Sequence, residues 1–326
     1  MTHTSLVVLP SLAGYSWHAI DPNHPADVSA LAALTAAADR ADNNEILSVP
    51  VQQPRDLVGI DLTNIPTMSA ITADGEIAGV AWITFDEGDT EIVATLHGRV
   101  HPEHRRRGIG SALLRWSETT VRDLLADQPK AVQLFLRNET LTGDARKLYA
   151  NCGFDLLFIE HVMQRNLSEP LLDFPMPQGI TTRAWSTDLI PAFYAMYHVS
   201  FAERPGFPGW TQAEWLDWIA GGDDFRPDLS WLAFEDDRPV AFLVSDVDPI
   251  HEPARAGWIT QLGSHPAMRN RGLGAALLVK AMNAYRADGM EYLALMVNDN
   301  NPKAQALYRK VGLDVYRYRG KYKKRL

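Results

Sequence analysis

Two short segments of the chain combine arginines with closely spaced glycines, a composition suited to binding phosphate groups. They read Arg105-Arg-Arg-Gly-Ile-Gly110 and Arg269-Asn-Arg-Gly-Leu-Gly274, and each is expected to lie between a strand and a helix. Glycine lets the backbone approach a ligand closely. The first amides of a helix lack intrahelical acceptors and lie at the positive end of the helix dipole. With the arginine charge added, each segment could hold a pyrophosphate.

Other common phosphate-binding loops fit these segments less well. A Walker loop requires Gly-Lys-Ser/Thr, which the sequence lacks. A dinucleotide-binding fingerprint requires a third glycine, where this chain has Leu113 and Leu277. The simpler alternative is a helix start with packing glycines and a solvated basic cluster. Because the segments recur with the same downstream tyrosine, the phosphate-binding interpretation is favoured.

Both segments belong to an internal repeat. His101–Leu114 reappears as His265–Leu278 at an offset of 164 residues, which is about half of the chain. A second pair follows in the same order, Leu148-Tyr-Ala-Asn-Cys-Gly-Phe154 and Leu307-Tyr-Arg-Lys-Val-Gly-Leu313. One duplicated domain explains both matches.

The repeat predicts the domain organisation and the fold class. A proline-rich segment, Asn166–Gly179, indicates a linker, so the domains are expected at 1–168 and 178–326. Each half alternates strand and helix patterns, which predicts an α/β fold with a mixed sheet. The expected strands are 67–72, 77–85, 92–100, 131–136, 231–234, 240–247, 257–264 and 292–297, and the expected helices are 109–125, 144–151, 273–287 and 302–310.

Together the two motifs resemble a known family. His-Pro-x-x-Arg-x-x-Gly-Ile/Leu-Gly after a strand, followed by Asn-x-x-Ala-x-x-Leu-Tyr-x-x-x-Gly, is similar to the acyl-CoA-binding core of the GNAT superfamily of N-acetyltransferases. The resemblance covers both halves, so the chain resembles a tandem GNAT protein organised like the mycothiol synthases. It implies two consecutive GNAT-like domains, each a mixed, mostly antiparallel sheet flanked by helices. The implied cofactor is acetyl-CoA or another acyl-CoA.

The C-terminal half matches both motifs in full. The resemblance implies that its strand amides bind the pantetheine arm and its glycine loop binds the pyrophosphate. A tyrosine on the later helix would protonate the departing thiolate, and Tyr308 matches that catalytic position. The implied cofactor-binding residues are Leu262, Ser264, Arg269, Asn270, Arg271, Gly272, Leu273, Gly274, Ala275, Asn298 and Asn301.

The N-terminal half keeps the loop and departs from the second motif. Thr142 stands where the other copy has Asn301, and Gly108 to Tyr149 spans 41 residues against 36 for Gly272 to Tyr308. This half is therefore expected to hold acyl-CoA as a structural ligand without catalysing. Its implied cofactor-binding residues are Gly98, Val100, Arg105, Arg106, Arg107, Gly108, Ile109, Gly110 and Ser111.

The acid and the base of the reaction differ in how well the sequence identifies them. A phenol of pKa ~10 suits protonation of a thiolate, which favours Tyr308 over a purely core role. Many relatives place a glutamate on the strand before the loop, whereas Gly257–Leu262 has no carboxylate. His265 and its counterpart His101 precede a helix and are expected to cap it rather than catalyse. The remaining base candidates are Asp246, Asp248, His251 and Glu203, acting directly or through water.

The resemblance places acceptor specificity in the first helices of the catalytic half. Here that region is Ser200–Trp218, which contains three tryptophans, two Pro-Gly pairs and several acidic residues. Such a segment could line a pocket for a cationic amine with an apolar part, or form an ordinary loop and an amphipathic helix. The basic end of the chain, 317–326, is likewise either a tail on the last strand or a basic wall near the CoA phosphate.

Composition limits the functions that remain. The net charge of −9 argues against general nucleic-acid binding. No run approaches the ~18 apolar residues of a membrane span, and one cysteine, Cys152, fits a reducing cytoplasm. We therefore predict a cytoplasmic acyltransferase that moves an acetyl or other short acyl group from CoA to a small-molecule primary amine. Alternatives are a protein N-terminal or lysine acetyltransferase and a non-enzymatic acyl-CoA-binding protein, and a homodimer stays open.

Overall fold

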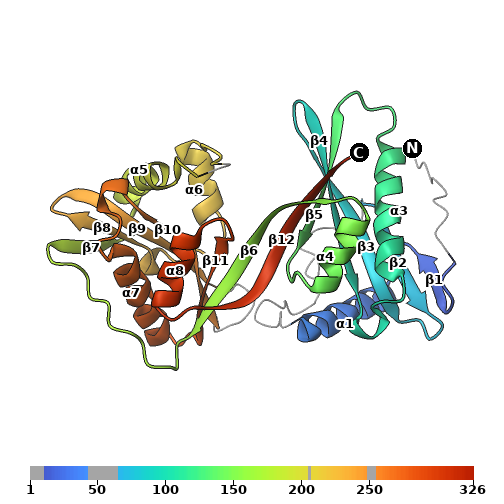
Figure 1. The fold of residues 1–326 in the computed structure, drawn as a ribbon, viewed down its shortest axis with the longest axis horizontal. Coiled ribbons are helices and arrows are strands. Elements are labelled where there is room, and N and C mark those ends of the chain that lie inside the picture. The colour runs from blue at the N-terminus through green and yellow to red at the C-terminus, as the bar shows by residue number, and fades with distance from the viewer. Residues whose placement is uncertain (1–10, 43–64, 205–206, 248–254) are drawn as a thin grey trace. The chain divides into compact units, whose positions relative to one another are not determined.

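The computed structural model describes residues 11–42, 65–204, 207–247 and 255–326. The chain divides into two compact units, which are described separately (Figure 1). Unit 1 comprises Met1–Ile159 and Arg317–Leu326, and unit 2 comprises Glu160–Tyr316. None of the described helices is long and apolar enough to cross a lipid bilayer.

Unit 1 is built on a sheet with strand order β1-β2-β3-β4-β5-β12. The β4–β5 pair is parallel, and the other neighbouring strands pair antiparallel. The elements are β1 (Tyr15–His18), α1 (Pro25–Ala41), β2 (Thr67–Thr72), β3 (Ile77–Glu87), β4 (Glu91–Val100), η3 (Pro102–His104), α3 (Ile109–Leu124), β5 (Ala131–Asn138), α4 (Gly143–Asn151) and, at the end of the chain, β12 (Asp314–Arg325).

Unit 2 repeats this plan with strand order β6-β11-β10-β9-β8-β7, in which β10–β11 is the parallel pair. The predicted fold class, a mixed and mostly antiparallel sheet flanked by helices in each half, is confirmed. The elements are β6 (Asp155–Asn166), β7 (Ile180–Ala184), η4 (Thr187–Leu189), α5 (Ile190–Phe201), α6 (Gln212–Ala220), η5 (Pro227–Leu229), β8 (Trp231–Glu235), β9 (Arg238–Val247), β10 (Ala256–Ser264), η6 (Pro266–Met268), α7 (Leu273–Ala287), β11 (Tyr292–Asn298) and α8 (Pro302–Lys310).

The last strand of each half completes the sheet of the other half. β6 follows α4 and β12 follows α8, so the two are equivalent strands of the repeat. In unit 1, however, β5 pairs with β12, and in unit 2, β11 pairs with β6. The compact units therefore divide the chain differently from the predicted domains, because residues 160–168 lie in unit 2 and residues 317–326 lie in unit 1.

The basic residues at 317–325 lie on β12, which fits the first of the two alternatives for this segment, a tail on the last strand. Lys324 Nζ donates to Glu118 Oε2 and to the Cys152 carbonyl, both at 2.8 Å. Arg319 Nε lies 2.7 Å from Glu139 Oε2. These partners all belong to unit 1, so β12 is tied to unit 1 by charge as well as by strand pairing.

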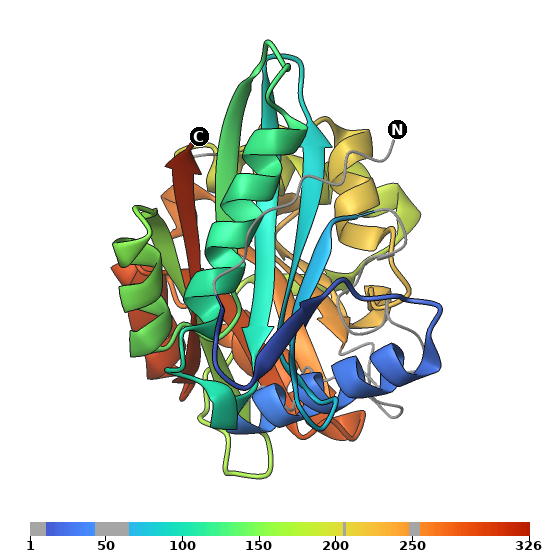
Figure 2. The ribbon, with the colours of Figure 1, turned by 90° about the vertical axis from the view of Figure 1, so that its right-hand side faces the viewer.

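Helices cover both faces of the unit 1 sheet. Side chains alternate between faces along a strand, and β3 shows this pattern: Ala81 and Ile83 pack in the cluster of α3, and Val80 and Trp82 pack in the cluster of α1. Figure 2 shows α3 lying across the sheet. In unit 2, α7 packs on the face of Leu243, and α5 and α6 pack on the face of its neighbours Phe242 and Val244.

Candidate functional site

The two glycine loops have the same backbone conformation. Each follows a central strand and a short 3-10 turn and leads into helix α3 or α7. Arg106 and Asn270 have φ of 65° and 64°, and Gly108 and Gly272 have φ of 86° and 84°. Such left-handed values are adopted by glycine without steric cost. The duplication in the sequence therefore extends to the geometry of the loops.

The first turn of each helix leaves main-chain amides without helical partners. Helical hydrogen bonding begins with Ala112 N to Gly108 O in α3 and with Ala276 N to Gly272 O in α7, both 3.0 Å. The amides that precede these donors have no acceptor within their helix. Together with the helix dipole, such amides form a favourable site for phosphate. Both loops thus have the donors that a pyrophosphate needs.

The second glycine of each loop makes room for the helix that carries the motif tyrosine. A Cβ on Gly274 would lie 2.9 Å from Leu307 Cδ2, and one on Gly110 would lie 3.3 Å from Leu148 Cδ2. A Cβ on Gly272 would meet no described atom within 4 Å. Gly272 is therefore required by its φ, and Gly274 by the close packing of α8.

Replacing Gly274 with alanine is expected to destabilise the protein, because the added methyl group overlaps Leu307. Overpacking of this kind typically costs ~1–3 kcal/mol, which thermal unfolding can measure. In Gly274→Ala/Leu307→Ala the overlapping group is gone, so the double variant should be no less stable than Leu307→Ala alone. Losses that simply add would contradict the packing role of Gly274.

The strand before each loop separates from its parallel neighbour before it ends. In unit 2 the β10–β11 pairing stops at Ile259 and Leu295, although β10 continues to Ser264. In unit 1 the β4–β5 pairing stops in the same way at Leu96 and Leu136. One edge of each remaining stretch has no strand partner in the described part of the chain. The predicted strand ligands lie in these open stretches: Gly98, Val100, Leu262 and Ser264.

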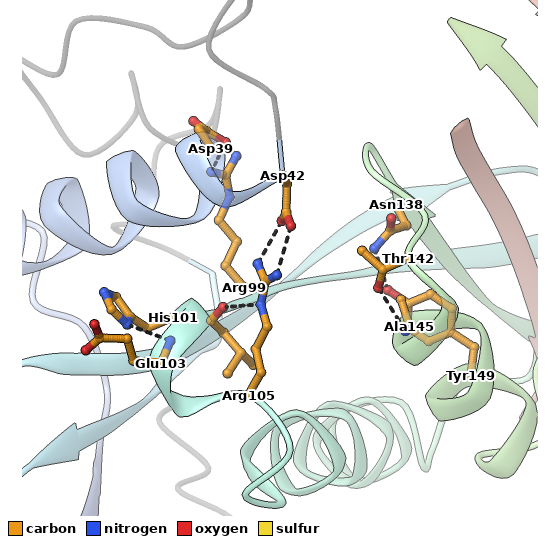
Figure 3. A network of polar contacts seen from close by, with 11 residues as sticks. Asp39, Asp42, Arg99, His101, Glu103, Arg105, Asn138, Thr142, Ala145 and Tyr149 are labelled. Atoms are coloured by element: carbon orange, nitrogen blue, oxygen red, sulfur yellow. Dashed lines mark hydrogen bonds and ion pairs between the residues drawn. The ribbon is translucent and has the colours of Figure 1, made fainter. Parts of the chain in front are cut away.

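The loop arginines, which we predicted to face phosphate, pair with groups of their own unit. Arg105 makes a bidentate ion pair with Asp42, with both distances 2.8 Å (Figure 3). Arg269 Nη1 lies 3.3 Å from Glu203 Oε2, and its Nη2 donates to the Ser200 carbonyl. The first arginine of each loop therefore ties the loop to the end of the first helix. The other three pair as follows: Arg106 with Asp144, Arg271 with Glu235, and Arg107 with the Tyr15 hydroxyl.

Asn301, predicted as a cofactor ligand, caps helix α8. Its Oδ1 accepts from Ala304 N at 3.2 Å. Thr142 Oγ1 accepts from Ala145 N at the same distance and caps α4 (Figure 3). Asparagine and threonine both serve as N-caps, so the Thr142 substitution is structurally neutral and does not mark a damaged motif. The histidine caps are found as predicted: His101 Nδ1 accepts from Glu103 N and His265 Nδ1 from Ala267 N.

The two motif tyrosines differ in their hydrogen bonding. Tyr149 accepts a hydrogen bond from Asn138 Nδ2 at 2.9 Å (Figure 3). In unit 2 the equivalent strand-end residue, Asn298, instead accepts from the Asn300 amide, and the Tyr308 hydroxyl has no hydrogen-bond partner among the described residues. Burial raises the pKa of each tyrosine to about 12. Tyr308 therefore stays protonated at neutral pH and is the tyrosine whose hydroxyl is free.

The chain near its N-terminus lies against loop 1. A Cβ on Gly108 would be 3.5 Å from Leu12 Cδ2. Tyr15 Oη lies 2.8 Å from His104 Nδ1. A Cβ on Gly272 would meet nothing within 4 Å, so within the described ranges the first glycine of loop 1 has a close neighbour that its counterpart in loop 2 lacks.

The predicted base candidates fall in different surroundings. Glu203 is taken by Arg269, as described above. Asp246 lies on β9, and its Oδ2 accepts from Thr260 Oγ1 at 2.5 Å. Its side chain is the candidate carboxylate that carries no ion pair in the described structure. Asp248 and His251 lie outside the described residues.

The tryptophan-rich segment forms a capped helix and part of the core. Trp215 on α6 is fully buried, and its Nε1 donates to Gln261 Oε1 at 3.2 Å. Trp210 and Trp218 contact each other with ring centroids 5.2 Å apart, and Trp218 is 52% exposed. Of the two interpretations of this segment, a substrate pocket or a loop followed by an amphipathic helix, the structure shows the helix. The exposed aromatic pair lies at its edge.

Both halves of the chain match one protein family. Residues 190–313 match the acetyltransferase (GNAT) family, and residues 67–156 match the acetyltransferase (GNAT) domain. The two matches fall in the two halves of the repeat and include both glycine loops. The predicted tandem organisation is therefore confirmed.

Similar proteins cover almost the whole chain. A mycothiol acetyltransferase of Salinispora tropica is 30% identical over 301 residues, which is 88% of this chain and 89% of the relative. A GCN5-related N-acetyltransferase from Sphaerobacter thermophilus has a TM-score of 0.72 at 25% identity, covering 98% and 97% of the two chains. A tandem GNAT protein from the clavulanic acid biosynthesis pathway shares the fold, with a TM-score of 0.63 at 15% identity over 95% of this chain and 98% of its own.

Proposed function

The chain belongs to the GNAT family of acetyltransferases, and on that premise we propose that it acetylates a small-molecule primary amine in the C-terminal unit, unit 2. As a member of this family it is an N-acetyltransferase that uses acetyl-CoA. The name of the mycothiol acetyltransferase relative points to a small-molecule acceptor. With one cysteine and this cofactor, the cytoplasm is the proposed location.

One observation carries the assignment to unit 2: the Tyr149 hydroxyl accepts a side-chain hydrogen bond, and the Tyr308 hydroxyl has no hydrogen-bond partner in the described part of the chain. A general acid must present its proton to the leaving group. The hydrogen bond from Asn138 Nδ2 fixes the position of the Tyr149 oxygen, whereas the Tyr308 hydroxyl has no hydrogen-bond partner among the described residues that would hold it away from a leaving group. The open space around Gly272 among the described residues, where Gly108 has Leu12 beside it, supports the same assignment.

Each part of unit 2 has a role in this proposal. The first-turn amides of α7 hold the pyrophosphate, and the open edge of β10 near Leu262 and Ser264 holds the pantetheine arm. Acetyl-CoA, when bound, supplies the thioester carbonyl and the leaving thiolate. Tyr308 gives its hydroxyl proton to that thiolate. Burial raises the pKa of Tyr308 to about 12, so the hydroxyl of Tyr308 is protonated at neutral pH and can act as the donor.

The acceptor class is tested by CoA release from acetyl-CoA with a panel of primary amines, with the products identified by mass spectrometry. The panel holds amino sugars, amino acid amides, polyamines, lysine peptides and peptides with free N-termini. Acetylation of small amines alone supports the proposal. Preference for a peptide would replace it with the protein acetyltransferase alternative, and no turnover with any amine would leave an acyl-CoA-binding protein.

We expect two acetyl-CoA sites per chain, because both loops have free first-turn amides and open strand edges. Calorimetric titration of the wild type should saturate at two molecules. Gly108→Val and Gly272→Val each place a β-branched residue at a left-handed φ, and each should remove one site. Only Gly272→Val should abolish turnover, whereas Gly108→Val should mainly lose ligand stabilisation, ~2.7 kcal/mol at a hundredfold excess over Kd.

Saturation of the wild type at one molecule, lost only in Gly272→Val, would rule out the unit 1 site. Loss of turnover in Gly108→Val, with the unit 2 site intact, would show that catalysis takes place in unit 1 and that the assignment to unit 2 is wrong.

A further inference from the structure

Strand β10, the central strand of unit 2, has a β-bulge at which it contacts a carboxylate of the neighbouring strand β9. The pairing of β10 with β9 shifts register between Ile259 and Gln261. Thr260, the residue at the shift, donates from Oγ1 to Asp246 Oδ2 at 2.5 Å. Bulges re-aim side chains and occur often beside active sites. Here the bulge turns a threonine hydroxyl toward Asp246.

Asp246 keeps one carboxylate oxygen buried and unused. Its Oδ1 is buried without a hydrogen-bond partner among the described residues. A buried carboxylate oxygen without a donor is costly, and such groups in native proteins call for an explanation. Burial raises the pKa of Asp246 to about 6, the Thr260 bond lowers it, and the nearby Asp224 raises it.

The carboxylate lies where the central strands separate. The parallel pairing of β10 with β11 ends at Ile259, the residue before Thr260. The side chain of Asp246 points to the α5 and α6 face, because its neighbour Ser245 accepts from Tyr285 of α7 on the opposite face. Trp215 of α6 lies on that same face and bonds Gln261, the residue after Thr260. Asp246 therefore lies on the same face of the sheet as the aromatic helix, beside the point where the β10–β11 pairing ends, on the β9 side of β10.

Unit 1 has no carboxylate at the equivalent place. There β3 and β4 pair without a register shift, and His97 takes the position of Gln261 in the repeat. His97 stacks on Trp82 at 5.0 Å, and its Nε2 lies 3.1 Å from Thr84 Oγ1. Burial lowers the pKa of His97 to about 4, so it is neutral at working pH. The feature is therefore confined to the unit that we propose to be catalytic.

We propose that Asp246 is the general base that removes a proton from the ammonium form of the acceptor, with Thr260 positioning it. This inference rests on the proposed function. The resemblance to relatives implies a glutamate on the strand before the loop, a stretch without a carboxylate here. The acid group is instead supplied by β9, across the strand pair from Trp258.

The proton balance of the reaction is met by two residues of unit 2. Asp246 takes one proton from the ammonium and leaves a neutral amine, whose nitrogen forms a bond to the thioester carbon. When the bond from that carbon to sulfur breaks, Tyr308 donates a proton to the sulfur. The nitrogen loses its second surplus proton in the same collapse, which restores the Tyr308 hydroxyl. Asp246 then releases its proton to solvent, so one proton leaves per amide formed.

The pH dependence follows from the groups around Asp246. Asp246 must be ionised to act, so kcat/KM should fall as pH drops through about 6. The charged group that acts on Asp246 is Asp224, and Tyr285 of α7 interacts with Asp246 and also with Arg226 and Asp228. Removing the Thr260 hydroxyl raises the pKa of Asp246, because that bond stabilises the carboxylate. Removing the Asp224 charge lowers the same pKa, because like charges repel.

The test is a set of pH profiles of kcat/KM, measured with acetyl-CoA and the amine of highest turnover in the panel. Thr260→Val should shift the acid limb to higher pH, and Asp224→Asn should shift it to lower pH. Asp246→Asn should lower kcat/KM by ~10²–10⁴-fold and abolish the acid limb, with acetyl-CoA affinity unchanged. Asp237→Asn, in the exposed β8–β9 turn, is the matched control and should behave as wild type.

Each outcome decides the proposal. If Asp246→Asn does not fold, opposite shifts in the other two variants still support it. An acid limb that neither variant moves, or full activity in Asp246→Asn, overturns the role of Asp246 and leaves the proposed function intact. A wild type that acetylates no amine of the panel overturns the proposed function, and this inference with it.

Discussion

Tyr308→Phe is expected to lower kcat by ~10²–10⁴-fold while leaving the affinity for acetyl-CoA unchanged. The substitution keeps the aromatic ring that packs in the unit 2 core and removes only the hydroxyl. Because that hydroxyl has no partner among the described residues, its loss leaves no buried group unsatisfied, and stability should change little. Steady-state kinetics and calorimetric titration measure the two effects separately.

The matched control is Tyr149→Phe, which makes the same change in unit 1. Here the hydroxyl is bonded to Asn138 Nδ2, so its removal should reduce the stability of unit 1 by ~1 kcal/mol and leave turnover near wild type. If Tyr149→Phe abolishes transfer and Tyr308→Phe does not, the catalytic unit is unit 1. An unchanged kcat in Tyr308→Phe would return Tyr308 to a packing role.

Local structural features could be predicted because the same motifs occur in both copies of the internal repeat. The expected helices 273–287 and 302–310 and the expected strand 67–72 have these bounds in the structure, and other expected elements differ by a few residues. The Arg-x-x-Gly-x-Gly segments have the strand–loop–helix setting that their glycines indicate. A local backbone conformation such as the positive φ of Gly272 restricts the residue type, so the sequence itself indicates it.

What could not be predicted depends on partners that are distant in the sequence. Arg105 and Arg269 form ion pairs with Asp42 and Glu203, respectively, and neither carboxylate belongs to a motif that would have predicted the pair. Asn138 donates the hydrogen bond that distinguishes Tyr149 from Tyr308. The sequence does not reveal this bond, because Asn298 occupies the same strand-end position in the other copy. The bulge at Thr260 appears only once the register of two strands is known. Thr142, which departs from the motif in the sequence, makes the same helix cap that Asn301 makes in the other copy.

The strand exchange is the largest such feature, since both copies of the repeat carry an equivalent strand. Periodicity in the sequence can predict each strand but not which β neighbour it pairs with. The linker at 166–179 predicted domains at 1–168 and 178–326. The observed pairing of β5 with β12 and of β11 with β6 joins strands from both sides of that linker. The consequence is that unit 1 is complete only once residues 317–326 have been made.

Removing residues 317–326 is therefore expected to destabilise unit 1, although the segment lies in the C-terminal half. Unit 1 would lose the strand that pairs with β5, the buried Tyr322 ring, and the Lys324 contacts with Glu118 and the Cys152 carbonyl. Unit 2 would keep all six of its strands. Hydrogen exchange should show lost protection in β4 and β5 and retained protection in β10 and β11.

A point variant makes the same test in the full-length chain. Tyr322 is 4% exposed and packs in the unit 1 core, so Tyr322→Ala should cost ~3–5 kcal/mol, as for other large aromatic residues in cores. Lys323→Ala, at the adjacent exposed position of the strand, should be close to neutral. If Tyr322→Ala or the truncation loosens β10 and β11 rather than β4 and β5, the last strand belongs to the sheet of its own half. The fold would then divide where the linker predicted, between 168 and 178, and each half would have to fold without the other.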